Sequence, residues 1–173
     1  MNDHETTDIS APLLAFLDRL GIETRTMDHA PVFTVAESQA LRGAIAGAHS
    51  KNLFVKDKKG RLFLVTALED ASLDLKRLHE AIGAQGRVSF ASADQLREHL
   101  GIEPGSVTPF AVMNDRAGAV TMVLQEALMR HDVQNFHPLT NRRTTTIRRA
   151  DLVRFLEAAN HPPRIVALPE AAK

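Results

Sequence analysis

The feature that most constrains the fold is a hairpin in the first half of the chain. Two runs rich in apolar and β-branched residues, 51–56 and 61–67, flank the four-residue turn 57–60. Aspartate and glycine in so short a connection are typical of a β-hairpin. Strands joined in this way pair antiparallel. The chain is therefore expected to build its sheet around an antiparallel pair.

Helical and extended segments alternate irregularly along the rest of the chain. Capping residues, glycine stops and apolar spacing predict helices at residues 10–20, 34–41, 74–82, 92–100, 125–130 and 150–159. Further strands are predicted at residues 22–28, 87–90, 110–114, 119–124, 133–136, 144–148 and 164–168. This order favours an α+β fold, with a mixed, largely antiparallel sheet and packed helices. The 173 residues are expected to form a single domain, with flexible ends at 1–9 and 169–173.

The composition excludes several classes of function. The sequence contains no cysteine, which excludes a disulfide framework, a thiolate zinc site and a cysteine nucleophile. Lys and Arg together number 21, as do Asp and Glu, so bulk basicity does not support a general nucleic-acid binder. No apolar run approaches the roughly 20 residues of a membrane span, and the polar first residues do not resemble a signal peptide. We expect a soluble, cytoplasmic protein without membrane association.

A dense polar turn lies between the two predicted strands at 133–136 and 144–148. In the stretch NFHPLTN, the side chains of Asn135, His137 and Thr140 surround a proline. The functional interpretation is that His137 contacts a ligand; the alternative is a capped turn in which His137 and Thr140 satisfy loop backbone groups. None of the eight histidines forms an HxH, HxxxH or HExxH pattern, so a zinc hydrolase has little support.

Lysines of the hairpin are a second group of candidates. Lys51 begins an otherwise apolar strand beside Asn52. It is either a charge that protects the strand edge or a cation that points into a pocket, toward a carbonyl oxygen or phosphate. Lys56, Lys58 and Lys59 at the hairpin tip are either solvated turn charges or contacts for a phosphate.

The loop GSVTP at residues 105–109 is a third candidate. Glycine allows a backbone to approach a ligand closely, and free N–H groups in such a turn can bind an oxyanion. The loop lacks the GK[ST] ending of a Walker phosphate loop, and alone it is a weak signal. Arg142 and Arg143 begin a basic cluster just beyond His137, which is either a solvated face or a contact for a nucleic-acid backbone.

Four motifs in order give these candidates a common interpretation. They are DHAPVFT at 28–34, KNLF at 51–54, GSVTPF at 105–110 and NFHPLTN at 135–141. Together they resemble the prolyl-tRNA editing superfamily, which includes the insertion domain of bacterial prolyl-tRNA synthetases and freestanding trans-editing deacylases. The chain is most similar to the freestanding alanyl-tRNA(Pro) deacylase branch, over residues 13–159. The resemblance implies hydrolysis, without a metal or other cofactor, of the ester that joins a wrong amino acid to the 3′ end of tRNA(Pro).

The resemblance also implies roles for individual residues. Lys51 matches the family's key lysine, Asn52 the adjacent polar residue, His137 the histidine of the NFHPL-type motif, and Gly105 the first residue of the loop that shapes the aminoacyl site. These four are the candidate catalytic residues. The candidate substrate-binding residues are Val32, Phe33, Leu53, Ser106, Val107, Thr108, Pro109 and Phe136. The candidate tRNA-binding residues are Lys56, Lys58, Lys59, Arg142 and Arg143.

The expected partner is the acceptor end of tRNA(Pro) carrying a small amino acid, with prolyl-tRNA synthetase as a second candidate partner and no requirement for an oligomer. Two alternatives to an Ala-tRNA(Pro) deacylase stay open. One is the same chemistry on Cys-tRNA(Pro) or another small aminoacyl-tRNA. The other is a module that binds tRNA or a synthetase and catalyses nothing.

Overall fold

The expected hairpin is the centre of the structure. The computed structural model describes residues 8–31 and 35–172. In it, β2 (Ala48–Lys56) and β3 (Leu62–Leu68) pair antiparallel, from Ser50 opposite Leu68 to Lys56 opposite Leu62. Gly60 in the connecting turn has a φ of 78°, a left-handed conformation that favours glycine. The prediction of an antiparallel hairpin is confirmed.

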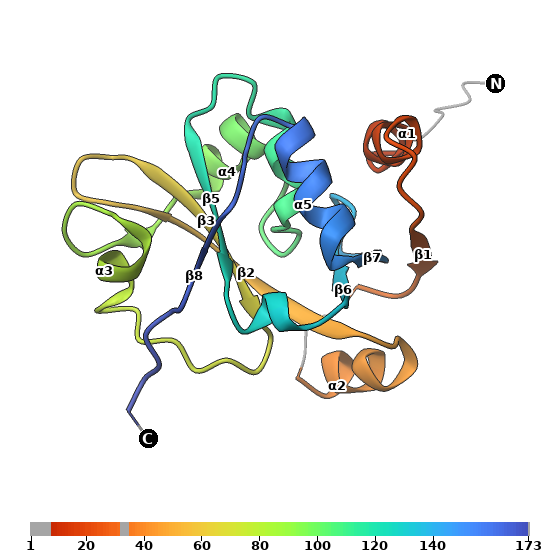
Figure 1. Ribbon diagram of the computed structural model, residues 1–173, viewed down its shortest axis with the longest axis horizontal. Helices are drawn as coiled ribbons and strands as arrows, with labels where there is room; N and C mark the ends of the chain where they lie inside the picture. The colour runs from red at the N-terminus through yellow and green to blue at the C-terminus, as the bar shows by residue number, and fades with distance from the viewer. Residues whose placement is uncertain (1–7, 32–34, 173) are drawn as a thin grey trace.

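One sheet contains all eight strands of the described chain, in the order β1-β7-β6-β2-β3-β5-β8, with β4 paired to β2 (Figure 1). Pairing is antiparallel for β1–β7, β6–β7, β2–β3 and β2–β4, and parallel for β2–β6, β3–β5 and β5–β8. The predicted mixed α+β sheet is therefore confirmed. The remaining strands are β1 (Arg25–Asp28), β4 (Ser89–Phe90), β5 (Val120–Gln125), β6 (Val133–Phe136), β7 (Arg143–Arg148) and β8 (Arg164–Val166).

Strand β2 is shared between neighbours in an unusual way. One edge pairs with β3 along residues 50–56. The opposite edge pairs with β6 only at Ala48 and His49, and with β4 only at Val55 and Lys56. Residues 50–54 lie between these two short pairings. The middle of β2 is therefore the place where the sheet can open toward a ligand.

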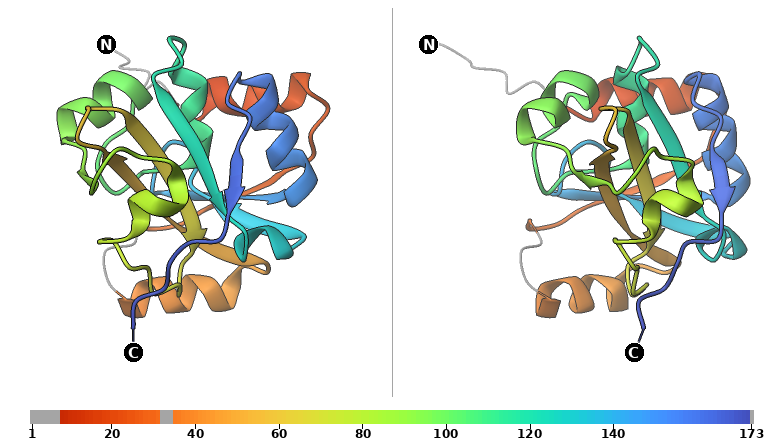
Figure 2. Two further views of the ribbon diagram at one scale, coloured as in Figure 1. Left: turned by 60° about the vertical axis from the view of Figure 1, so that its left-hand side comes forward. Right: turned by 90° about the vertical axis from the view of Figure 1, so that its left-hand side faces the viewer.

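Alternation along β3 divides the apolar residues between two cores. Leu62 and Leu64 belong to a larger core, whereas Phe63, Val65 and Ala67 belong to a smaller one. Helices α1 (Ala11–Arg19), α4 (Ala93–Leu100) and α5 (Arg149–Ala158) cover the larger core, and α3 (Leu78–Ile82) covers the smaller one. Helix α2 (Val35–Ala44) lies apart from these, at the lower end of the molecule near the start of β2 (Figure 2).

The prediction of a strand at 110–114 was wrong. These residues form a 3₁₀ helix, η1 (Pro109–Asn114). Thr108 precedes it in an extended conformation and its hydroxyl accepts a hydrogen bond from the backbone N–H of Phe110, while Pro109 occupies the first turn. A capping threonine and an N-terminal proline thus outweigh the strand-like apolar run that follows them.

Smaller differences concern where elements begin and end. The expected helix at 125–130 is only the 3₁₀ turn η2 (Leu128–Arg130), because β5 continues to Gln125. The helix expected from Asp74 begins at Leu78, because Asp74 accepts hydrogen bonds from the backbone N–H groups of Lys76 and Arg77 in a preceding turn. The strand expected from residue 22 begins at Arg25.

Residues 169 and 171, in the C-terminal stretch expected to be flexible, form backbone hydrogen bonds to the loop before α3. Asp74 N–H donates to the Pro169 carbonyl, and Ala171 N–H donates to the Ser72 carbonyl. Leu168, just before them, is buried in the smaller core.

Across the described ranges, no helix is long and apolar enough to span a bilayer.

The hairpin turn is fixed by a buried carboxylate. Asp57, 5% exposed, accepts hydrogen bonds from the backbone N–H groups of Lys59, Arg61 and Gln85 and from the Arg61 guanidinium at 3.0 Å. Burial alone raises the pKa of this carboxyl, but the bonds from Gln85, Arg61 and Lys59 outweigh it and lower the pKa to about 2. One side chain thus ties the hairpin to the loop before β4.

We predict that Asp57→Asn lowers the melting temperature at pH 7 by several degrees, because the neutral amide cannot accept these four bonds as the carboxylate does. Because the folded pKa, about 2, lies below the ordinary value, the stabilisation is complete above about pH 4 and is lost as the pH falls toward 2. Melting curves between pH 2 and 7 test this, with the exposed Asp94→Asn as control. Equal melting temperatures for wild type and Asp57→Asn would contradict it.

Candidate active site

A small cavity lies against the middle of β2, where the sheet opens. Its volume is about 60 Å³, and it is bounded by β2, the β6–β7 turn, helix α2 and the residue after β3. A water molecule needs roughly 10–15 Å³ of such space, so the cavity has room for a few water-sized groups. The lining residues are Leu41, His49, Ser50, Asn52, Glu69, Asn135, Phe136, His137 and Thr144.

His137 contributes a ring nitrogen with a defined role. Its Nδ1 lies 3.0 Å from the backbone carbonyl oxygen of Arg143. A carbonyl oxygen can only accept, so Nδ1 carries the hydrogen and Nε2 of the neutral ring keeps its lone pair. Burial lowers the pKa of His137, helped by the neighbouring His29 and His49, although the bond to Arg143 and the charge of Glu69 oppose this. The ring is therefore an acceptor at neutral pH.

Asn52 contributes a donor. Its Oδ1 accepts a hydrogen bond from the hydroxyl of Thr66, directly opposite on β3, at 2.6 Å. The fully buried Thr66 hydroxyl donates to this oxygen, so the amide oxygen faces β3. The Nδ2 hydrogens remain for a group in the cavity. An amide donor and a histidine acceptor thus line the same small space.

Two further histidines of the site are also anchored on backbone carbonyls. His29 Nδ1 lies 2.8 Å from the Ala30 carbonyl, and its Nε2 lies 2.8 Å from the Thr144 hydroxyl. His49 Nε2 lies 3.0 Å from the Ile45 carbonyl. The His29 and His137 rings are 6.3 Å apart between centroids. Each ring is fixed in orientation by the chain around it.

The buried Asn135 holds the cavity's framework together. Its Nδ2 donates to the carbonyls of Ala46 and Ala48, at 3.0 and 3.2 Å, and its Oδ1 accepts from the Thr146 hydroxyl at 2.6 Å. Its own carbonyl accepts from the Ser50 hydroxyl at 3.0 Å. One residue therefore connects β6 to both β2 and β7. Asn135, which the polar NFHPLTN motif had singled out, therefore has a structural role.

Lys51 does not line this cavity. Adjacent residues on a strand point to opposite faces, and its neighbours Ser50 and Asn52 face the cavity. The Lys51 ammonium instead donates to the backbone carbonyl of Ala71. Leu53, expected as a pocket wall, packs against the smaller core. The structure thus brings Asn52, Phe136 and His137 together but places Lys51 and Leu53 on the other face of β2.

The loop 105–109 lies beside the β6–β7 turn without lining the cavity. Gly105 has a φ of 91°, and a Cβ at this position would lie 3.7 Å from Asn141 Nδ2. Ser106, Thr108 and Pro109 are buried. Val107 packs against the larger core. Val32 and Phe33 lie outside the described residues.

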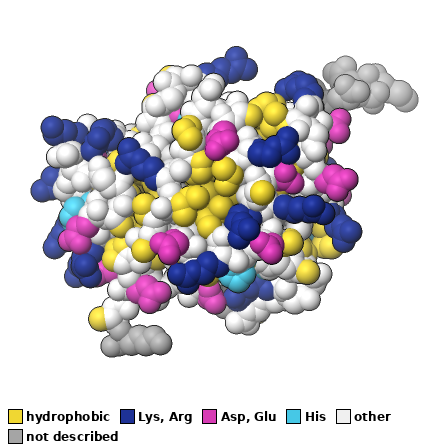
Figure 3. Space-filling model, viewed as in Figure 1, with side chains coloured by type: hydrophobic (Ala, Val, Ile, Leu, Met, Phe, Trp, Pro, Cys, Tyr) yellow, Lys and Arg dark blue, Asp and Glu magenta, His cyan; other side chains and the backbone are white. Residues whose placement is uncertain are grey.

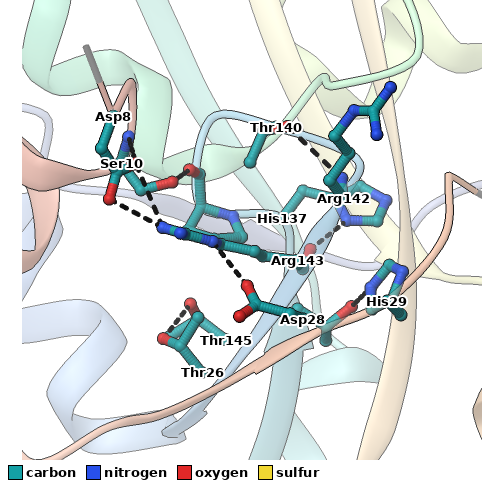
Figure 4. A network of polar contacts seen from close by, with 12 residues as sticks. Asp8, Ser10, Thr26, Asp28, His29, His137, Thr140, Arg142, Arg143 and Thr145 are labelled. Atoms are coloured by element: carbon teal, nitrogen blue, oxygen red, sulfur yellow. Dashed lines mark hydrogen bonds and ion pairs between the residues drawn. The ribbon is translucent and has the colours of Figure 1, made fainter. Parts of the chain in front are cut away.

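The candidate tRNA-binding cations differ in their availability. Lys and Arg side chains are prominent over the β2–β3 hairpin, at the left of the view in Figure 3. Lys58 and Lys59 are both exposed, and the aliphatic part of Lys58 packs over Gly86. Arg142 is exposed and its side chain extends away from the polar network in Figure 4. Arg143 instead forms ion pairs with Asp8 and Asp28.

Sequence reasoning missed several residues of the cavity. The cavity is also lined by Leu41, His49, Glu69 and Thr144. None of these four belongs to a stretch that the sequence analysis chose for its chemistry; Thr144 was noted only as the start of a predicted strand. Glu69 pairs with Arg42 of α2 at 3.3 Å.

Within residues 8–31 and 35–172, no group of three or more His, Asp or Glu side chains is arranged to hold a metal ion. A metal-independent reaction stays a prediction.

Comparison with known proteins identifies similar chains. The family described as the aminoacyl-tRNA editing domain matches residues 29–155. Prolyl-tRNA synthetase associated domain-containing protein 1 of Danio rerio is 41% identical over 162 residues, which are 92% of this chain and 88% of that protein. The prolyl-tRNA editing protein ProX of Acetoanaerobium sticklandii is 33% identical over 162 residues, 93% of this chain and 98% of that protein.

Solved structures share the fold. The crystal structure of a protein described as a candidate trans-editing enzyme for prolyl-tRNA synthetase superposes with a TM-score of 0.71. It is 18% identical, and the match covers 96% of this chain and 100% of that one. At this identity the similarity supports the fold alone. The mixed sheet with its flanking helices is therefore a known architecture.

We predict that the imidazole of His137 titrates below the ordinary histidine value near 6.5, because burial disfavours its charged form. The unfolded chain then binds a proton more readily than the folded one, so this residue reduces stability as the pH falls below about 6.5. NMR titration of the histidine ring protons, with His137→Gln to assign the signal, measures it. A His137 pKa at or above 6.5 would contradict the proposed environment.

Proposed function

Because this chain belongs to the aminoacyl-tRNA editing domain family, we propose that it is a trans-editing deacylase that hydrolyses the ester of mischarged Ala-tRNA(Pro). Its relatives include a protein named for prolyl-tRNA editing, matched along nearly its whole length. The observation that supports the reaction is the pairing of a donor, Asn52 Nδ2, with an acceptor, His137 Nε2, in a cavity of about 60 Å³.

The two groups fit the steps of ester hydrolysis. The oxygen of a water molecule attacks the carbonyl carbon of the ester, and His137 Nε2 takes the proton that this water loses. Negative charge develops on the carbonyl oxygen, which Asn52 Nδ2 stabilises by donating a hydrogen bond. When the bond to the ribose oxygen breaks, that oxygen takes the proton back from His137. The products are free alanine and tRNA(Pro).

Lys51 is proposed to act from outside the cavity. Its ammonium lies on the opposite face of β2, where it donates to the Ala71 carbonyl. A cation at this strand suits the phosphate or ribose of the terminal nucleotide better than the ester oxygen. Lys59 and Arg142, both exposed, are proposed to contact the tRNA backbone. The loop at Gly105 is proposed to shape the entrance beside Asn141.

Selectivity follows from the cavity's size. A proline pocket in a synthetase cannot strongly reject alanine, since each missing methylene changes the binding free energy by only about 1–3 kcal/mol. A second site can discriminate in the opposite direction if it is too small for proline. The small cavity walled by Leu41 and Phe136 is the proposed place for such a size filter. A trans-editing site that excludes proline would therefore remove the alanine that the synthetase pocket fails to reject.

We predict that Asn52→Ala lowers kcat for Ala-tRNA(Pro) deacylation by about 10²–10³, because one hydrogen-bond donor to the oxyanion is lost. Asn114→Ala is the matched control: that amide donates to the Leu100 carbonyl, on α4, and its loss leaves kcat unchanged. Single-turnover deacylation and a filter-binding assay measure rate and tRNA affinity separately. If wild-type protein binds tRNA but leaves Ala-, Cys- and Pro-tRNA(Pro) intact, the chain is a binding module and the proposal fails.

We predict that Leu41→Ala enlarges the cavity and raises deacylation of Pro-tRNA(Pro) relative to Ala-tRNA(Pro) by about tenfold, the effect of roughly one methylene group. Leu41 is only half-buried on α2, so its truncation spares both hydrophobic cores. Rates on Ala-, Cys- and Pro-tRNA(Pro) for wild type and variant give the ratio. If the wild-type protein hydrolyses Cys-tRNA(Pro) faster than Ala-tRNA(Pro), the proposed alanine specificity is wrong and Cys-tRNA(Pro) is the substrate.

A further inference from the structure

The turn that carries His137 is held from the outside by the first described residues of the chain. Ser10 is fully buried, and its hydroxyl donates to the backbone carbonyl of Pro138 at 2.5 Å, across 128 residues of sequence. Ser10 N–H in turn donates to the carboxylate of Asp8 at 2.9 Å. The chain before α1 is thus attached to the residue that directly follows His137.

A two-carboxylate ion pair forms the second attachment (Figure 4). The Arg143 guanidinium lies between Asp8, at 2.9 Å, and Asp28 at the end of β1, at 2.7 Å. The same residue's backbone carbonyl accepts the Nδ1 hydrogen of His137. The side chain of Arg143 therefore places the very carbonyl that orients the catalytic ring. Hydrogen bonding by Arg143 also holds the pKa of Asp8 below its usual range, so the pair is charged at neutral pH.

The turn needs such support because its backbone is strained. Leu139, one residue beyond Pro138, has a φ of 68°, a left-handed conformation that a leucine adopts only when its surroundings impose it. Its side chain is 4% exposed and packs in the larger core. The core therefore anchors the turn on one side, and Ser10 and Arg143 hold it on the other.

We propose that residues 8–10 form a positioning clamp for the active site, in which Ser10 and the Asp8–Arg143–Asp28 ion pairs keep His137 aimed at the substrate. The expected effect of the clamp on catalysis rests on the proposed deacylase function. The contacts that form the clamp do not depend on that function. Asp8, Ser10 and Asp28 precede residues 29–155, the part of the chain that the family match covers. The clamp also gives Arg143 a role other than tRNA binding.

The two roles of Arg143 predict different kinetics. A tRNA contact affects binding, so its loss raises KM and weakens the salt dependence of affinity. A positioning residue affects the reacting geometry, and even small misplacements reduce kcat. We expect Arg143→Gln, Asp8→Asn and Ser10→Ala each to lower kcat about tenfold with little change in KM. Arg143→Lys, which keeps the charge, is expected to restore part of the rate.

A matched control exists on α4. Arg97 also pairs with two carboxylates, Glu103 at 2.9 Å and Asp94 at 3.3 Å, but it does not line the cavity or contact the β6–β7 turn. Arg97→Gln removes an ion-pair cluster of the same kind and should leave kcat unchanged. Urea unfolding of every variant separates a loss of global stability from a loss of positioning.

A spectroscopic measurement tests the clamp without relying on catalysis. In ¹⁵N-labelled protein, the His137 Nδ1–H signal should exchange with water at least tenfold faster in Asp8→Asn and Ser10→Ala than in wild type or Arg97→Gln. Unchanged exchange in both clamp variants overturns the proposal, as does a KM effect with unchanged kcat. If the wild-type protein deacylates none of the aminoacyl-tRNAs, the proposed function fails, and the exchange rates still decide whether residues 8–10 position His137.

Discussion

The structure depends on how strand β2 divides its far edge between two partners. β6 occupies only its first two residues and β4 only its last two, while β3 pairs along residues 50–56 on the other edge. The β2–β3 hairpin supplies rigidity, and the interruption on the far edge supplies access. The cavity lies at that interruption, so Asn52 sits on a well-supported strand and still faces a ligand. A continuous strand in place of β6 and β4 would close the site.

Desolvation then determines what the cavity can do. His137 is enclosed enough for burial to lower its pKa, and its Nδ1 hydrogen is used by a backbone carbonyl. Both effects favour the neutral ring with a lone pair on Nε2. Asn52 is similarly constrained, because the buried Thr66 hydroxyl occupies its oxygen. Each group is left with one function toward the cavity, which is what preorganised hydrogen bonding requires.

Sequence patterns predicted the hairpin, the mixed sheet and most helices, because turn chemistry, capping residues and apolar periodicity are local. They failed at 110–114, where Thr108 and Pro109 impose a helical turn on an apolar run that could equally form a strand. The NFHPLTN motif led to His137, but the cavity walls Leu41, Glu69 and Thr144 come from separate elements and carry no local signal. The motif KNLF likewise grouped Lys51 with Asn52 as site residues, but alternation along β2 places Lys51 on the opposite face from Asn52.

Electrostatics explains why a chain without net charge can still suit a polyanionic partner. The 21 cationic side chains are matched by 21 acidic ones, so affinity cannot come from the overall field. It must come from a few local cations, and the structure reduces their number further. Arg143 is paired with Asp8 and Asp28, whereas Lys58, Lys59 and Arg142 are exposed. Few phosphate contacts imply weak binding with a shallow salt dependence. For the proposed trans-acting enzyme, weak binding allows correctly charged tRNA to be released quickly before the next molecule is bound.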